Sequence, residues 1–185
     1  MMQKLISLTL LLFFSNQCFA ASSSYQVDLI LFVQPKADAM NHDFGLNTPF
    51  MPIAKTAIAL TSSATQSAKR YQLLSFSKSS LRNQYYLLNR KHRYQILGHY
   101  SWIQPGTSSK SVILPTADSN GWQMQGTVRI RKSNYYLFDT DLQLSPPSNP
   151  ELTYTINRKQ RLKEDVVYYL DHPQLGILIK VHQIT

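Results

Sequence analysis

From Tyr94 to the end of the chain, apolar and polar side chains alternate with a period of two, and this pattern constrains the fold more than any other feature. Such alternation is typical of strands that bury one face. A tripeptide at 132–134 can close a hairpin, and the Pro-rich stretch 146–150 cannot enter the interior of a sheet. The sequence therefore predicts an antiparallel sheet with strands over 94–103, 125–131, 135–144, 152–162, 166–170 and 175–184.

The first half of the chain is less regular. A β-branched and aliphatic run over 25–33 predicts a central strand that contains one acid, Asp28, which we interpret as an acid at the sheet edge or paired with an Arg. A catalytic carboxylate is the alternative. The stretch 35–67 is polar and predicts an irregular connection with one short helix over 53–60, and 70–74 predicts a short extended segment.

Apolar residues at 81, 85 and 88 recur with helical spacing and predict an amphipathic helix capped by Ser79 or Ser80. Arg90, Lys91 and Arg93 fall in its expected last turn, where cations suit the helix dipole. Together these patterns predict one α+β domain, mostly antiparallel β-sheet with one or two helices.

The N-terminus predicts a secretory signal peptide over residues 1–20. Lys4 precedes an apolar run of about ten residues, which is too short to span a bilayer as a helix, and small residues flank the expected cleavage point after Ala20. Cleavage would leave a domain over 21–185 that has no cysteine and does not span the membrane, because the one cysteine is Cys18. An uncleaved anchor and lipid attachment at Cys18 are the alternatives.

The charge of the chain favours polyanionic partners. Removing Lys4 lowers the formal net charge from +9 to +8. Because export would separate the protein from nucleic acid, we expect no nucleic-acid partner. Anionic wall polymer, lipopolysaccharide phosphate and acidic protein surfaces remain as candidates.

No motif predicts catalysis. The five histidines lack the spacing of metal ligands, no Gly-x-Ser-x-Gly elbow occurs, and the six glycines are scattered singly. Ser75 and Lys78 have a Ser-x-x-Lys spacing, but no Lys-Thr-Gly follows. We therefore predict no catalytic residue, metal or cofactor, and a protein that is not an enzyme.

Basic and aromatic residues are the candidates for ligand binding. Arg forks bind carboxylates bidentately, and tyrosine offers a flat surface to sugar rings. Arg129 and Arg131 alternate with Val128 and Ile130, which places both guanidinium groups on one face of a strand. A second basic cluster consists of Arg158, Lys159, Arg161 and Lys163. A solvated strand face is the equal alternative for these basic residues. His172, in an Asp-His-Pro turn, is either a turn residue or a ligand contact. The candidate residues are Arg129, Arg131, Arg158, Arg161, Lys163, Trp102, Tyr168, Tyr169 and His172.

Four pieces of the chain, in order, carry a resemblance to a known family. These are the strand over 25–32, the residues Tyr94, Leu97, His99, Trp102 and Gln104, the hairpin over 126–142, and the turn over 171–176. Together they resemble the cell-shape-integrity (CsiV) family of periplasmic peptidoglycan-binding proteins. The chain departs from the family pattern at Val166 and Tyr168, where Glu and His are expected, and at Gln160 and Lys163.

The resemblance implies a non-catalytic periplasmic protein that binds peptidoglycan and supports cell-wall assembly and cell shape, acting with wall synthases or their outer-membrane activators. The basic candidates would then hold wall carboxylates, and Trp102, Tyr168 and Tyr169 would supply stacking or packing. If the expected Glu and His form a ligand site, this chain has lost it; if they only stabilise the sheet, the replacements are harmless. A module that contacts envelope proteins without binding glycan is the alternative function, and an enzyme with a distributed site is the third.

Overall fold

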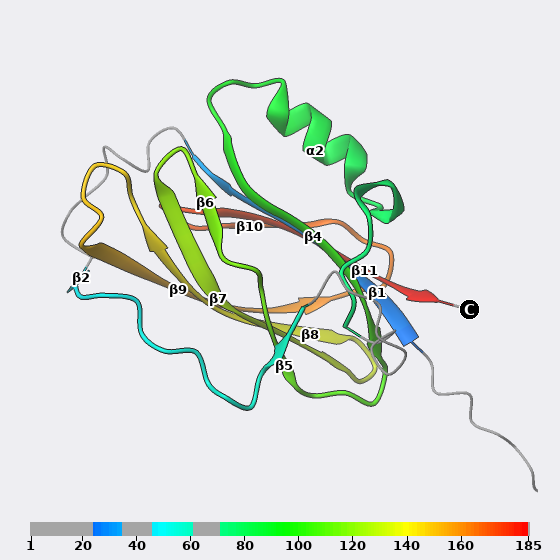
Figure 1. Ribbon diagram of the computed structural model, residues 1–185. Coiled ribbons are helices and arrows are strands. Elements are labelled where there is room, and N and C mark those ends of the chain that lie inside the picture. The colour runs from blue at the N-terminus through cyan, green and yellow to red at the C-terminus, as the bar shows by residue number, and fades with distance from the viewer. Residues whose placement is uncertain (1–23, 35–45, 61–70, 185) are drawn as a thin grey trace, which may run out of the picture.

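The computed structural model describes residues 24–34, 46–60 and 71–184. Within these ranges two β-sheets pack face to face, and one α-helix covers part of the outer side of the smaller sheet (Figure 1). The predicted signal peptide and its cleavage point lie outside the described residues. The α+β class is confirmed, although the expected antiparallel sheet is divided into two.

The smaller sheet has four antiparallel strands in the order β10-β11-β1-β4. Their bounds are Tyr168–Asp171 for β10, Gly176–Ile184 for β11, Ser24–Val33 for β1 and Gln95–Pro105 for β4. Strand β1 pairs with both β11 and β4, so its prediction as a central strand is confirmed.

The larger sheet is built around three long antiparallel strands. These are β7 (Trp122–Lys132), β8 (Tyr136–Ser145) and β9 (Leu152–Leu162). Four short strands extend it: β2 (Leu46–Asn47), β3 (Ile58–Ala59), β5 (Ser111–Ile113) and β6 (Ala117–Ser119). Strand β3 pairs with β5 in parallel.

The main hydrophobic core lies between the two sheets. Alternate residues of β1 face it, including the fully buried Val27 and Leu29, and they meet residues of the larger sheet such as Ile130 and Phe138. Hydrogen bonds also join the sheets, because Tyr25 Oη and Gln104 Nε2 each donate to the carbonyl oxygen of Ile130, both at 3.0 Å.

The outer face of the smaller sheet has a second, smaller core. The helix α2 (Arg82–Asn89) and the preceding turn η3 (Phe76–Lys78) lie over it. Leu81, just before α2, is fully buried against Ile30 and Phe32 of β1. Strand β1 therefore buries both faces, which explains why its sequence is an almost continuous apolar run.

Two local predictions were wrong. The short helix expected over 53–60 is absent from the described residues of that segment, which form a turn followed by the short strand β3. The helix α2 ends at Asn89, so Lys91 and Arg93 lie beyond its last turn, and neither predicted serine caps it. Ser80 bonds to Asp28 and Ser79 to His99, and these contacts between elements compete with local capping.

Candidate ligand-binding surfaces

The three long strands of the larger sheet bring four basic side chains to its outer face. Cross-strand pairing aligns Arg129 with Asp139 and Lys159, and Arg131 with Leu137 and Arg161. Because side chains on directly paired residues point to the same face, these cations lie together. We call Arg129, Arg131, Lys159 and Arg161 the basic face.

One carboxylate organises half of the basic face. Asp139 Oδ2 accepts hydrogen bonds from Arg129 Nη2 at 2.9 Å and from Arg131 Nη2 at 3.0 Å. Arg161 is exposed, and its guanidinium lies 4.8 Å from the ring centroid of Tyr135. A stacked guanidinium keeps its hydrogen-bond donors at the ring plane's edge, where they can meet an anion.

The positive charge of this face exceeds its negative charge. Asp141 is the next acid on the same side of β8, two residues beyond Asp139. Four cations against these two carboxylates leave a formal excess of +2. The face can therefore attract an anionic polymer without being neutralised by its own acids.

Arg158 and His172 form a separate site at the edge between the two sheets. Arg158 has the opposite strand parity from Arg161, and its Nη2 donates to the carbonyl oxygen of Asp171 at 3.0 Å. His172 lines a hollow of about 360 Å³ with Tyr154 and Gln174. Burial, and next the Arg158 charge, lower the pKa of His172. The sequence cluster around 158–163 is therefore divided by the fold.

The aromatic candidates differ in exposure. Trp102 is fully buried in the core, where its Nε1 donates to Gln104 Oε1 at 3.3 Å, so it packs and offers no ring to a surface ligand. The Tyr168 hydroxyl accepts a hydrogen bond from the backbone N–H of Lys163 at 2.9 Å. Tyr169 is 51% exposed and stacks on Phe32.

Asp28 occupies a position that sequence reasoning placed wrongly. Its side chain is fully buried on the outer side of β1, and its carboxylate accepts hydrogen bonds from Ser101 Oγ at 2.5 Å and Ser80 Oγ at 2.6 Å. Gln26 Nε2 donates to it at 3.0 Å, and His182 Nδ1 lies 3.8 Å away. An acid inside an apolar strand was the available signal, but the partners come from three other segments.

Comparison with known families places the chain. A family model described as "Peptidoglycan-binding protein, CsiV" matches residues 4–184. The chain belongs to the CsiV family. No curated protein and no solved structure matches it.

The two positions that depart from the expected CsiV pattern lie at the surface or near it. Val166 is 42% exposed between the turn at 164–165 and β10, and Tyr168 is half-buried. A Glu at position 166 would therefore face solvent. The Tyr168 hydroxyl, in contrast, accepts a hydrogen bond from the backbone N–H of Lys163.

Two further findings concern the described part of this CsiV protein. No group of three or more His, Cys, Asp or Glu side chains there is arranged to hold a metal ion. No helix there is long and apolar enough to cross a membrane.

Proposed function

We propose that this CsiV protein is a non-catalytic periplasmic protein that binds peptidoglycan and supports cell-wall assembly and cell shape. Residues 1–20 would direct its export and be removed, leaving one domain over 21–185. It would act with wall synthases or their outer-membrane activators. Membership of a family described as peptidoglycan-binding supports peptidoglycan as the ligand. The excess positive charge of the basic face is the observation that supports this face as the surface that contacts it.

The chemistry of the wall suits the basic face. Stem peptides of peptidoglycan carry carboxylates, and guanidinium groups bind carboxylates through paired, charge-assisted hydrogen bonds. Arg129 and Arg131 already hold one carboxylate, that of Asp139, in this way. Lys159 and Arg161 are exposed and would be the groups that engage the polymer.

The test is co-sedimentation of the purified protein with protein-free peptidoglycan at low and physiological salt. We expect the Lys159→Glu/Arg161→Glu variant to bind at least about tenfold more weakly, because two attractions become repulsions. The matched control is Arg90→Glu/Lys91→Glu, which makes the same charge change beyond the end of α2. If both pairs weaken binding equally, only net charge matters and the basic face is not the contact.

A second function, a module that binds envelope proteins without binding glycan, is supported by the open edge of β10. Among the described residues this strand ends its sheet; its own Tyr169 is 51% exposed, and the preceding Val166 and Val167 are 42% and 38% exposed. Apolar side chains along an unpaired edge can accept a strand from another protein. Failure to pellet with protein-free wall at any salt concentration would favour this function.

A further inference from the structure

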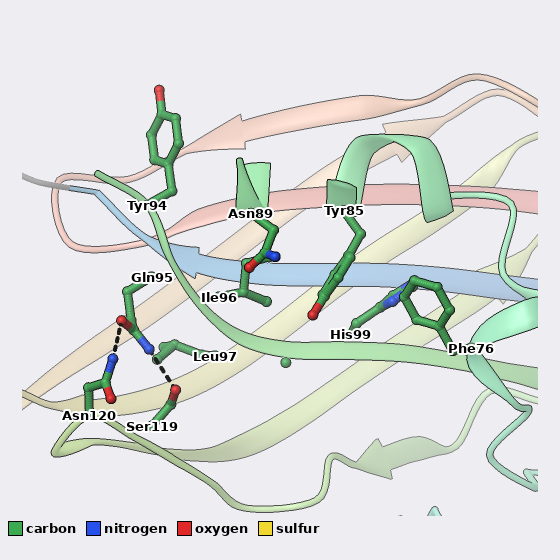
Figure 2. Close-up of a pocket in the computed structure, with 11 residues that line it drawn as sticks. Phe76, Tyr85, Asn89, Tyr94, Gln95, Ile96, Leu97, His99, Ser119 and Asn120 are labelled. Carbon is green, nitrogen blue, oxygen red and sulfur yellow. Dashed lines mark hydrogen bonds between the residues drawn. The ribbon is translucent and has the colours of Figure 1, made fainter. Parts of the chain in front are cut away.

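An open pocket of about 500 Å³ lies between α2, the edge strand β4 and the turn after β6 (Figure 2). Its size falls within the roughly 300–1,000 Å³ that small-molecule sites occupy. None of the candidate residues from the sequence lines it. Its main side chains are Phe76, Tyr85, Gln95, His99, Ser119 and Asn120.

One end of the pocket is built from aromatic rings. The Tyr85 ring stacks on His99, with centroids 5.3 Å apart and planes at 21°. Phe76 stands perpendicular to His99 at 4.9 Å and meets Tyr85 edge to face at 5.0 Å. Mutual packing of this kind holds the rings in place, so they form a fixed aromatic wall in which Phe76 stands across the Tyr85–His99 pair.

The other end is built from amide and hydroxyl groups that bond to one another. Asn120 Nδ2 donates to Gln95 Oε1 at 2.7 Å, and Gln95 Nε2 donates to Ser119 Oγ at 2.6 Å (Figure 2). Within the part of the chain that the structure describes, each group keeps unused capacity: a second N–H on Gln95, a hydroxyl hydrogen on Ser119 and the carbonyl oxygen of Asn120. This row can donate to a ligand and accept from it.

The lining carries no formal charge. Among the described residues that line it there is no Asp, Glu, Lys or Arg, and the only titratable group besides two tyrosines is His99. Burial lowers the pKa of His99, against a smaller opposing effect of Asp28, so the imidazole is neutral at pH 7. A charged ligand would lose its hydration here without gaining an ion pair, and this costs free energy. A neutral ligand does not carry that cost.

We propose that this pocket binds an uncharged N-acetylhexosamine ring of the wall's glycan strand. The apolar face of the sugar lies on the Phe76 and Tyr85 end, and its hydroxyl and acetamido groups meet Gln95, Ser119 and Asn120. The inference rests on peptidoglycan being the ligand of the protein, and it assigns the sugar and the stem peptide to different sides of the molecule.

The test uses tri-N-acetylchitotriose, an uncharged sugar that has no stem peptide, and measures its affinity for the purified protein by titration calorimetry. We expect saturable binding that Gln95→Ala weakens about fivefold, since it removes the hydrogen-bonding amide, and that Phe76→Leu weakens about threefold, since it removes one aromatic ring. Leu87→Gln is the control: this residue is 60% exposed on α2, lies outside the pocket, and should leave the affinity unchanged.

A third pocket variant, at Asn120, guards against misfolding. Asn120 has a φ of 50°, a backbone conformation that glycine adopts readily, so Asn120→Gly removes the amide without backbone strain. No binding of the trisaccharide, or binding that none of these pocket variants weakens, would overturn the proposal. Co-sedimentation with intact wall tests the basic face separately. If only the sugar assignment is wrong, the pocket variants should still pellet with the wall as the parent protein does.

Discussion

At Asp28 a single buried acid holds together three parts of the molecule. Its carboxylate receives hydrogen bonds from β1 itself, from β4 through Ser101, and from the segment before α2 through Ser80. A buried charged group is stable only when its hydrogen bonds are made, and here they are. Asp28 therefore fixes the segment that positions η3 and α2, and with them one wall of the pocket.

We predict that Asp28→Ala lowers the free energy of unfolding by about 3 kcal/mol, because it leaves several buried donors without an acceptor. Asp28→Asn, which keeps the shape and one acceptor oxygen, should cost clearly less. Urea denaturation followed by circular dichroism, with the m-value checked for constancy, measures both. Equal, small losses for the two variants would mean that the network contributes little to stability.

At the scale of elements, the hairpin of β7 and β8 depends on one backbone position. Gly126 has a φ of 151°, and a Cβ built there would lie 2.3 Å from the carbonyl oxygen of Asp141 and 2.7 Å from the Cα of Leu142. Backbone atoms cannot move aside as a flexible side chain does. A side chain at this position therefore separates the two strands that carry half of the basic face.

We predict that Gly126→Ala costs about 3 kcal/mol of stability, from strain in φ together with the steric clash. The loss should appear as a lower midpoint in thermal unfolding, and binding to peptidoglycan should weaken because the spacing of Arg129 and Asp139 changes. Gly106→Ala, at a loop glycine without a positive φ, is the control. A midpoint equal to that of this control would contradict the argument.

The elements that the sequence predicted well are those whose signal is local and long. The alternation in β7, β8 and β9 spans about ten residues in each strand, and all three were predicted within a few residues. The two-residue strands β2 and β3 carry no such signal, because they exist only through pairing with distant partners. Tertiary pairing of this kind cannot be inferred from propensity.

The candidate site shows the same limit. Strand parity correctly placed Arg129 and Arg131 on one face. Proximity in sequence wrongly grouped Arg158 with Arg161. The two residues are three positions apart in β9, so their side chains point to opposite sides of the sheet. The pocket beneath α2 was not predicted, since its lining comes from segments around residues 76, 85, 95 and 119 that meet only in the fold.

The whole molecule presents two chemically different surfaces on opposite sides of one core. The basic face covers the outer side of the larger sheet. The neutral aromatic pocket lies where α2, the edge strand β4 of the smaller sheet and the turn after β6 meet. Figure 1 shows α2 and the larger sheet on opposite sides of the smaller sheet. The two sheets share the core and the Ile130 carbonyl contacts, so the surfaces are held at a fixed separation. A branched polymer of glycan and peptide could engage both.

The stability of the whole molecule should fall as the pH is lowered from about 7.5 to about 5. Burial lowers the pKa values of His99 and His172 below the unfolded value of 6.5. As the pH falls through 6.5, these two histidines bind more protons in the unfolded chain than in the folded chain. Protonation therefore favours unfolding. Free carboxyl groups titrate mainly below this window.

Substitution of one histidine separates its part of this effect. His99→Gln retains a polar side chain toward Ser79 but cannot titrate, so the decrease in thermal midpoint between pH 7.5 and pH 5 should become smaller. The exposed His92→Gln, placed after α2, should leave the decrease as large as in the parent protein. A midpoint that does not fall with pH in the parent, or a slope that His99→Gln leaves unchanged, would show that the half-buried His99 imidazole does not govern acid stability.

The affinity for the trisaccharide should decline over the same pH range. His99 forms a wall of the pocket, so its protonation would place a charge beside the neutral ligand.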